Sequence, residues 1–364
     1  MSPAIDIGAT DSPPASVPVA LPSRRRPARD ASREEMPITG DLVDRYGRVH
    51  HDLRISVTDR CNLRCVYCMP ETGVTFTDRE QVLSFAEITR VARVAHQMGV
   101  TSLRLTGGEP LQRHRLTDLV RSLSAIGFED IALTTNGTAL ARLAQPLADA
   151  GLTRVTVSCD SLDPETFARI RRRGVLSTVL QSMDAAEAAG LRPLKVNVVL
   201  MSGVNETEVR AFAQFARQTG RVVRFIEFMP LDAERRWQRD AVYSAERVVE
   251  EIDAIWPLEP IWDEHAPAER YRFRDGAGEI GVIASVTRPF CGTCDRLRLT
   301  ADGAIRNCLF GHDEPSIRDV MRAGGSDEEM AILLRRAVWD KLPGHGINDT
   351  GFLRPKRSMF MIGG

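Results

Sequence analysis

Short apolar runs alternate with longer amphipathic segments from residue 53 onward, and this alternation limits the folds open to the chain more than any other feature. The short runs predict strands, and the segments whose apolar residues recur every three or four positions predict helices. The predicted strands lie at residues 53–57, 102–105, 131–134, 154–158, 195–200 and 222–228. The predicted helices lie between them, at residues 84–98, 115–125, 139–150, 178–189 and 206–218.

The predicted strands are almost continuously apolar, which is typical of strands buried on both faces of a parallel sheet. Six such strands, separated by helices, favour an α/β fold with an incomplete (β/α)6 barrel of the TIM type, because a closed barrel needs eight. A doubly wound open sheet would give the same periodicity. The cysteine-rich segment after the first strand favours the barrel, since barrel active sites lie at the C-terminal ends of the strands.

Two further regions are predicted outside the barrel, which would span residues 46–262. Residues 1–45 are rich in Pro, Ala and Arg without helix or strand periodicity, and this composition predicts a disordered tail. Residues 263–364 would form a smaller C-terminal α+β domain. Its predicted elements are a strand at 280–286, a hairpin at 296–308 and helices at 313–322 and 327–341.

The net charge and the cysteine content argue against several classes of protein. The formal net charge of −1 gives the chain no general attraction for nucleic acid or for anionic membranes. No apolar run approaches the ~18 residues that a membrane span requires. Seven cysteines, grouped as three, one and three, do not fit a secreted disulfide framework and indicate metal binding in a reducing compartment. We therefore expect a cytoplasmic protein without a nucleic-acid or membrane partner.

The first group of cysteines has the spacing C-x3-C-x2-C, at Cys61, Cys65 and Cys68, with Tyr67 between the last two. Thiolates are the usual ligands of iron–sulfur clusters. Three of them on a four-iron cluster leave one iron open to bind a small molecule. A zinc site or a set of buried thiols is the alternative, but zinc would need a fourth ligand, and no second CxxC or HxxxH pair follows nearby.

The second group comprises Cys291, Cys294 and Cys308. A CxxC pair suits zinc better than the first group does, and His312 could complete a Cys3His zinc site. Beside the first cysteine group, a second four-iron cluster with an open iron is the favoured interpretation. Such an iron can act as a Lewis acid and anchor a nitrogen lone pair of a substrate.

Cationic side chains within the apolar strands indicate an anionic ligand. Arg54, Arg104 and Lys195 belong to three predicted strands, while Arg296 and Arg298 alternate along a fourth and share one face. Buried cations are costly unless they are paired or bound to a ligand. Several converging cations suit a polyphosphate, because guanidinium groups match phosphate oxygens in pairs.

Several motifs together resemble one enzyme family. The cysteine loop with its aromatic residue is similar to that of radical S-adenosylmethionine (SAM) enzymes. Within these enzymes, the chain resembles the GTP 3′,8-cyclase family, which acts in molybdenum cofactor biosynthesis. This resemblance covers about residues 44–364. The segments that carry it are L-R-I-S-V-T-D-R-C-N at 53–62, L-T-G-G-E-P at 105–110, K-V-N at 195–197, F-I-E-F-M at 225–229, F-C-x-x-C at 290–294 and the terminal Gly363-Gly364.

The resemblance implies a reaction and its cofactors. One electron from a 4Fe–4S cluster would cleave SAM, and the 5′-deoxyadenosyl radical would take the hydrogen from ribose C3′ of GTP. Carbon C3′ would then bond to guanine C8, giving (8S)-3′,8-cyclo-7,8-dihydroguanosine 5′-triphosphate. The implied components are two 4Fe–4S clusters, SAM, GTP and a reducing electron donor. A downstream pterin-forming enzyme and a homodimer are further expectations.

The resemblance also implies roles for individual residues. Cys61, Cys65 and Cys68 would hold the SAM cluster, and Cys291, Cys294 and Cys308 the auxiliary cluster. The implied SAM contacts are Tyr67, Gly108, Ser158 and Met229. The implied GTP contacts are Arg54, Arg104, Thr134, Lys195, Arg296 and Arg298, and the tail at Gly363 and Gly364 would reach into the site. One position departs from the pattern, because Ser102 stands where some relatives have lysine, so Arg224 could supply the missing cation.

Two other functions fit part of the sequence. One is a radical SAM enzyme that modifies a peptide and carries an auxiliary cluster, although such enzymes often have more cysteines in their C-terminal part. The other is a zinc-stabilised binding protein without catalytic activity. Metal analysis would separate the latter from both enzymes.

Overall fold

The computed structural model describes residues 35–262, 267–312 and 314–363. The strands in this part of the chain form one eleven-stranded sheet. They are β1 (Asp52–Ser56), β2 (Ser102–Thr106), β3 (Asp130–Thr135), β4 (Arg154–Ser158), β5 (Lys195–Leu200), β6 (Val222–Glu227), β7 (Leu258–Ile261), β8 (Glu269–Phe273), β9 (Glu279–Ile283), β10 (Arg296–Leu299) and β11 (Ile305–Arg306). Their order across the sheet is β11-β10-β1-β2-β3-β4-β5-β6-β9-β8-β7.

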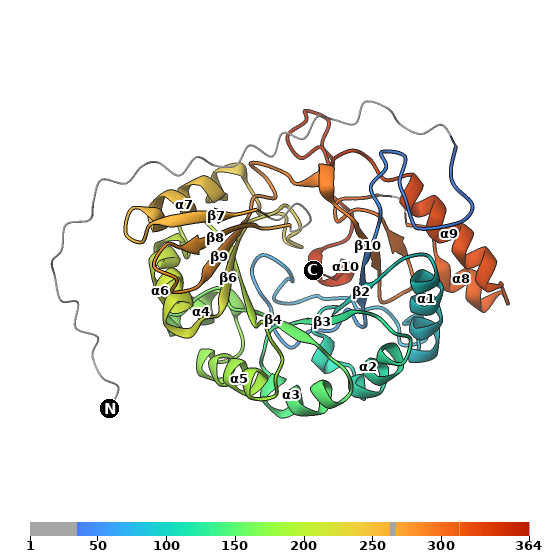
Figure 1. Ribbon diagram of the computed structural model, residues 1–364, viewed down its shortest axis with the longest axis horizontal. Coiled ribbons are helices and arrows are strands. Elements are labelled where there is room, and N and C mark those ends of the chain that lie inside the picture. The colour runs from blue at the N-terminus through green and yellow to red at the C-terminus, as the bar shows by residue number, and fades with distance from the viewer. Residues whose placement is uncertain (1–34, 263–266, 313, 364) are drawn as a thin grey trace.

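The first six strands settle the choice between a barrel and a doubly wound sheet. Strands β1 to β6 are neighbours in chain order and all pair in parallel. A doubly wound sheet would reverse its strand order at a switch point, which this sheet does not do. Figure 1 shows the strands curving into an open ring with helices on the outside. The predicted incomplete barrel is therefore confirmed.

The residues after 262 extend this sheet at both edges. Strand β9 adds to β6 in parallel, and β10 adds to β1 in parallel. Strands β7 and β8, which the sequence did not predict, follow β9 as antiparallel neighbours. Strands β10 and β11 form the predicted hairpin. The predicted division at residue 262 thus does not coincide with a break in the sheet, and it stays a prediction.

Side-chain N-caps mark the first residues of half of the described helices. The described helices are α1 (Phe85–Gln97), α2 (Leu116–Ser124), α3 (Leu140–Asp149), α4 (Pro164–Arg171), α5 (Leu176–Ala188), α6 (Val209–Thr219), α7 (Ala245–Asp253), α8 (Ile317–Arg322), α9 (Asp327–Trp339) and α10 (Met359–Ile362). Helix α1 begins at the capping box of Ser84 and Glu87 that its sequence contains. Helices α4, α7 and α10 were not predicted, because each is short or rich in charged residues.

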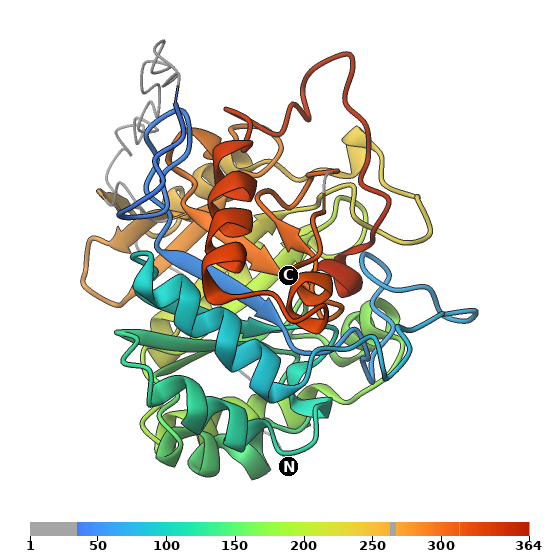
Figure 2. The ribbon, with the colours of Figure 1, turned by 90° about the vertical axis from the view of Figure 1, so that its right-hand side faces the viewer.

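The N-terminal segment joins the fold earlier than predicted. Residues 1–34 lie outside the described residues. Leu42 and Asp44, inside the predicted tail of residues 1–45, are fully buried, and Val43 forms a β-bridge with Val49. Helix α9 packs beside α1, so a helix from the C-terminal part of the chain covers the side of the barrel where α1 lies (Figure 2). No helix within the described ranges is long and apolar enough to cross a bilayer.

Candidate active site

One cavity inside the barrel collects most of the predicted site residues. The predicted residues that line it are Cys61, Cys65, Cys68, Cys291, Cys294, Cys308, Arg54, Arg104, Arg296, Arg298, Tyr67, Gly108, Thr134, Ser158 and Met229. They come from all parts of the sheet, so the cavity exists only when the barrel has formed. Lys195 does not line it, and Gly364 lies outside the described residues.

The two cysteine groups lie at opposite ends of neighbouring strands. The first group follows the C-terminal end of β1, whereas Cys291 and Cys294 precede β10, which runs parallel to β1. Strand β11 runs antiparallel to β10 and therefore returns Cys308 to the end where Cys291 and Cys294 lie. The cavity between the groups follows the direction of the strands.

Close backbone contacts hold the first cysteine loop in place. The amide of Gly108 donates to the carbonyl of Thr58 (2.6 Å), and the amide of Glu109 donates to the carbonyl of Arg60 (2.8 Å). A Cβ atom on Gly108 would lie 2.5 Å from the carbonyl oxygens of both Asp59 and Arg60. Only glycine allows this approach, so the Gly-Gly-Glu-Pro segment supports the loop from the second strand.

Replacing Gly108 by alanine is therefore expected to displace the cysteine loop. The added methyl group meets backbone atoms that cannot rotate away, and such overpacking typically costs about 1–3 kcal/mol. We expect a lower melting temperature and a lower iron content per chain. Gly351→Ala is the matched control, because a Cβ atom there meets nothing within 4 Å. Equal iron content in the two variants would contradict this role for Gly108.

The first three cysteines lie near one another, with Cys65 buried and Cys61 and Cys68 half-buried. Burial is the main cause that raises the pKa of Cys61 to about 12, and burial with the neighbouring thiols also raises the pKa of Cys68. Such thiols stay protonated unless a cation stabilises their thiolates. N–H groups already point at the sulfur atoms, from the Leu63 amide to Cys61 Sγ (3.4 Å) and from Arg171 Nη1 to Cys65 Sγ (3.5 Å). The donor set therefore fits a cationic iron–sulfur cluster.

Cations surround the second cysteine group. Although burial opposes it, Arg296 and Lys341 lower the pKa of Cys294 to about 6. Lys341 Nζ lies 3.5 Å from Cys294 Sγ and also donates to the carbonyl of Arg296 (3.0 Å). The Arg296 guanidinium stacks over the ring of Phe290, 4.7 Å from its centroid. Arg296 thus has partners at the cysteine group, in addition to lining the cavity where GTP was predicted.

The structure gives the zinc alternative no fourth ligand from His312. That side chain is exposed and does not line the cavity. His345 does line it, and because His345 Nδ1 accepts a hydrogen bond from the Ile347 amide (3.2 Å), Nε2 is the ring atom left for a metal. Among the residues that the structure describes, no three Cys, His, Asp or Glu side chains form a site for a single metal ion.

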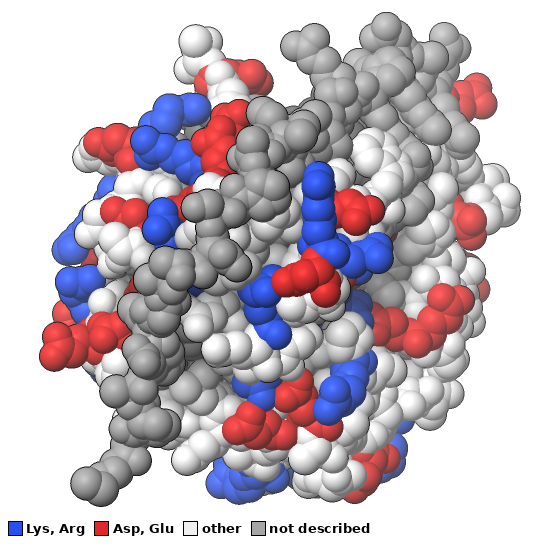
Figure 3. Space-filling model, turned by 60° about the vertical axis from the view of Figure 1, so that its left-hand side comes forward, with Lys and Arg blue, Asp and Glu red and all other residues white. Residues whose placement is uncertain are grey.

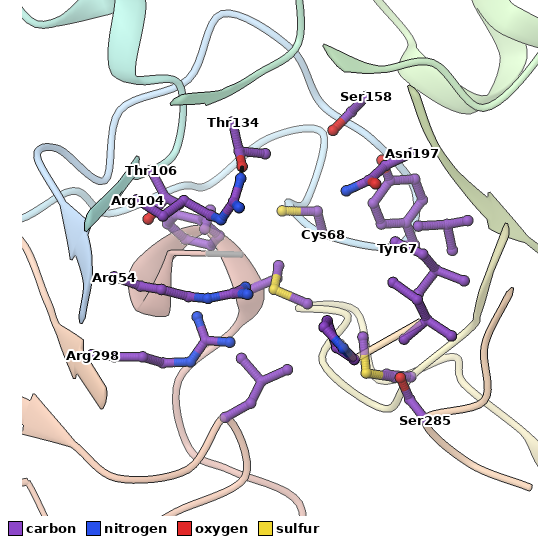
Figure 4. Close-up of a pocket in the computed structure, with 18 of the residues that line it drawn as sticks. Arg54, Tyr67, Cys68, Arg104, Thr106, Thr134, Ser158, Asn197, Ser285 and Arg298 are labelled. Atoms are coloured by element: carbon purple, nitrogen blue, oxygen red, sulfur yellow. Dashed lines mark hydrogen bonds between the residues drawn. The ribbon is translucent and has the colours of Figure 1, made fainter. Parts of the chain in front are cut away.

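Three guanidinium groups form a row across the cavity wall. Arg54 of β1 is in register with Arg298 of β10 on one side and with Arg104 of β2 on the other. Residues in register on neighbouring strands share a face. Figure 4 shows the three side chains extending side by side toward the centre of the site. This row, Arg298-Arg54-Arg104, is called the arginine row below.

The arginine row has few anionic partners. Arg54 lies 3.6 Å from Asp52, whereas Arg104 reaches only the hydroxyls of Thr134 (3.5 Å) and Thr156 (3.4 Å). Burial and the neighbouring Arg54 lower the pKa of Arg104 to about 9. Within the described chain, Arg104 and Arg298 form no ion pair. Buried and mutually repelling cations favour a bound polyanion, which would supply the missing charge.

Other predicted residues lie on the opposite wall. Ser158 and Tyr67 face the arginine row across the cavity, together with Asn197, which was not among the predicted contacts (Figure 4). Asn197 Oδ1 accepts a hydrogen bond from Arg224 Nε (3.0 Å). Arg224, considered from the sequence only as a substitute cation, lines the cavity as well. The K-V-N motif and the charge within β6 were the available signals for both residues.

The C-terminal segment enters the site. Arg298 Nη1 donates to the carbonyl of Gly363 (2.5 Å), and a Cβ atom on Gly363 would lie 2.5 Å from Thr106 Oγ1. Gly363 has a φ of +83°, a conformation that favours glycine. The penultimate residue therefore lies against the ends of β1 and β2, beside the arginine row.

Comparisons with known proteins give the same family as the sequence motifs. The chain matches the Radical SAM superfamily model over residues 55–216 and the Molybdenum Cofactor Synthesis C model over residues 221–347. A GTP 3′,8-cyclase of Corynebacterium glutamicum is 47% identical over 336 residues, with 89% of each chain covered. A GTP 3′,8-cyclase of Mycolicibacterium smegmatis is 46% identical, with 95% of this chain and 99% of the relative covered.

Solved structures resemble the fold at low sequence identity. Streptococcus suis SuiB bound to the precursor peptide SuiA has a TM-score of 0.59 at 14% identity, with 87% of this chain and 70% of that chain covered. Native anSMEcpe with bound AdoMet has a TM-score of 0.54 at 14% identity, with 81% and 82% covered. At these identities the likeness concerns the fold alone.

Proposed function

We propose that this chain, which belongs to the GTP 3′,8-cyclase family of radical SAM enzymes, forms the cyclised nucleotide in the cavity between its two cysteine groups. Conversion of GTP to (8S)-3′,8-cyclo-7,8-dihydroguanosine 5′-triphosphate is the first step of molybdenum cofactor biosynthesis. The single observation that carries the proposal is the arginine row, which places three cations between the two cysteine groups. The curated relatives favour the cyclase over a peptide-modifying enzyme.

The cysteine groups would hold two 4Fe–4S clusters. Cys61, Cys65 and Cys68 would hold the cluster that binds SAM and supplies the electron for its cleavage. Cys291, Cys294 and Cys308 would hold the auxiliary cluster, and the cations beside Cys294 support a bound thiolate there. Each group offers three thiols, so one iron of each cluster would be left for a ligand.

The remaining residues would orient the two substrates. Tyr67, Gly108, Ser158 and Met229 lie around the first cysteine group and would contact SAM. The arginine row and Arg224 would bind the triphosphate, with Thr134 beside Arg104. Holding the ribose between the SAM end and the auxiliary end lowers the entropic cost of bringing the reacting atoms together. The barrel wall and the C-terminal segment would exclude water from the reactive carbon.

Metal analysis with two ligand titrations tests this function. Anaerobically reconstituted protein is expected to contain about eight irons and eight sulfides per chain, four of each for every cluster. SAM should perturb the electron paramagnetic resonance (EPR) spectrum of one reduced cluster, and GTP that of the other. About four irons with zinc at the second cysteine group, or no response to GTP, would remove the GTP assignment. Zinc without iron would instead support a binding protein.

GTP affinity is expected to fall as the pH rises through about 8. Burial, followed by the nearby charges of Arg224, Arg154 and Arg104, lowers the pKa of Lys195 to about 8. Lys195 does not line the cavity, but its charge interacts with those of Arg224 and Arg104, which do, so it adds to the positive potential that a triphosphate would meet there. Lys195 is cationic below this pH and loses its charge above it, where binding of a triphosphate would require proton uptake. Calorimetry in buffers of different ionisation enthalpy measures both effects. Lys195→Arg should give a flat profile between pH 7 and 9, and the same flat profile in the unmodified protein would contradict the role of Lys195.

The proposal also includes expectations about the compartment and the partners of the protein. All seven cysteines are free thiols, which supports a reducing compartment such as the cytoplasm. On the face drawn in Figure 3, cationic and anionic side chains are interspersed. The homodimer, the identity of the electron donor and the transfer of product to a pterin-forming enzyme stay predictions, because the structure describes one chain.

A further inference from the structure

We propose that Arg171 and Asp160 form a buried charge pair that sets the reduction potential of the first cluster and positions its loop. This inference rests on the proposed function, because it assumes a cluster on Cys61, Cys65 and Cys68. Neither residue is among the site residues that the sequence predicted, and helix α4, which carries Arg171, was not predicted either.

The side chains of this pair connect directly to the cysteine loop. Arg171 Nη1 donates to Cys65 Sγ (3.5 Å), while Arg171 Nη2 lies 2.8 Å from Asp160 Oδ2. The Tyr67 hydroxyl donates to the same Asp160 oxygen (2.9 Å), and Asp160 Oδ1 accepts from the Val199 amide (3.0 Å). A single carboxylate therefore holds both the guanidinium and the aromatic residue of the cysteine loop.

Arg171 and Asp160 are both buried, so water screens their charges less than it screens a surface ion pair. The exposed fractions of Arg171 and Asp160 are 2% and 1%. Arg171 Nε and Nη2 are buried and have no hydrogen-bond partner among the described residues, so the contact of Nη2 with Asp160 is an ion pair without hydrogen-bond geometry. A buried donor left without a partner is costly, and these donors belong to a guanidinium that lines the cavity and contacts Cys65 Sγ through Nη1. Cluster sulfur atoms are acceptors of the kind that these donors lack.

Helix α4 also fixes the backbone of the loop. The amide of Arg64 donates to the carbonyl of Arg171 (3.2 Å), and the amide of Val66 donates to the carbonyl of Ile170 (3.0 Å). The last carbonyls of a helix have no partner within the helix, so they can accept from another segment. The cysteine loop is thus attached to α4 through the backbone, whatever the side chain of residue 171 is.

Charge determines the direction of the expected effect. Reduction adds a negative charge to the cluster, and a nearby guanidinium stabilises that charge, especially where water is excluded. Arg171 therefore raises the reduction potential of the first cluster, and Asp160 partly opposes it. Removing the cation should make the cluster harder to reduce, and removing the carboxylate charge should make it easier to reduce.

An EPR-monitored redox titration of the reconstituted holoprotein tests this inference. For Arg171→Gln, we expect the ratio of reduced to oxidised first cluster at a fixed potential to fall at least tenfold, which is 59 mV for a one-electron couple. Asp160→Asn should shift the potential in the opposite direction, and Arg171→Lys should restore most of the wild-type value. Arg169→Gln is the matched control, because Arg169 lies on α4 but is exposed, and its side chain donates to the carbonyl of Val204 rather than to the cysteine loop.

Each outcome bears on the proposal. Shifts of opposite sign in Arg171→Gln and Asp160→Asn would support it, since a purely structural disturbance would not reverse sign. If Arg171→Gln fails to hold its cluster, Asp160→Asn decides: a shift to higher potential supports the pair, and no shift or a lower potential overturns it. Unchanged potentials in fully loaded variants would overturn this inference alone, whereas wild-type protein without iron would overturn the proposed function with it.

Discussion

Protein with Cys65→Ala is expected to lose both SAM cleavage and GTP cyclisation by more than about 100-fold, the upper end of what residues that only support a metal ligand contribute. Cys65 belongs to the first cysteine group. A four-iron cluster on that group has only three thiolate ligands, and with two of them left it would not stay bound. Cys308→Ala, in the second group, is expected to keep SAM cleavage but form no cyclised nucleotide. Iron content should fall from about eight to about four per chain in either variant.

Cys159→Ala is the control for both cysteine variants. Cys159 is fully buried, donates to the carbonyl of Ser161 (3.3 Å) and does not line the cavity. It should keep about eight irons per chain and both activities. SAM cleavage in Cys65→Ala protein at the wild-type rate would refute the assignment of the first cluster. A full iron complement in Cys308→Ala protein would refute that of the second.

Replacing Arg298 by alanine is expected to weaken GTP binding by roughly 2–5 kcal/mol, a factor of about 30 or more, while SAM cleavage without GTP continues. Arg298 is 4% exposed and stands at one end of the arginine row. Its loss removes a cation from a water-poor site and also frees the carbonyl of Gly363. Equilibrium binding of GTP and the rate of 5′-deoxyadenosine formation measure the two effects separately.

The matched control for Arg298→Ala is Arg272→Ala. Arg272 lies on β8 of the same sheet but is exposed, so its removal should leave GTP affinity unchanged. Arg298→Lys should restore part of the affinity, because lysine keeps the charge but not the paired donors of the guanidinium. If SAM cleavage fails in Arg298→Ala while GTP affinity stays the same, the arginine row does not bind the triphosphate.

The sequence predicted the barrel strands well, because each of them can be recognised from the composition of its own short segment. Apolar runs buried on both faces can be recognised without knowing their neighbours. The pairing of β10 with β1 could not be read in the same way, since these strands are far apart in sequence and β10 has only four residues. Parity placed Arg296 and Arg298 on one face, but only the register aligned Arg298 with Arg54 and Arg104.

Helix α4 shows why part of the site was missed. The segment contains apolar Phe167 and Ile170 among several arginines, so its composition resembles a solvated surface. Burial of Arg171 depends on Asp160 and the cysteine loop, which approach it only in the folded barrel. Motifs located the cysteines, whereas the charges around them result from contacts between distant segments.

Because β1 pairs in parallel with β10, the length of these strands sets the separation of the two cysteine groups. The two cysteine groups stand at opposite ends of these neighbouring strands, and the five residues of β1 extend roughly 16 Å at about 3.3 Å per residue, the rise in a parallel sheet. Backbone geometry thus fixes the distance between the two ends of β1, and the arginine row lies between them. We expect this span to favour ligands whose reactive and anchored atoms lie a matching distance apart, and a one-residue insertion in β1 before Arg54 would change both that length and the face that Arg54 presents.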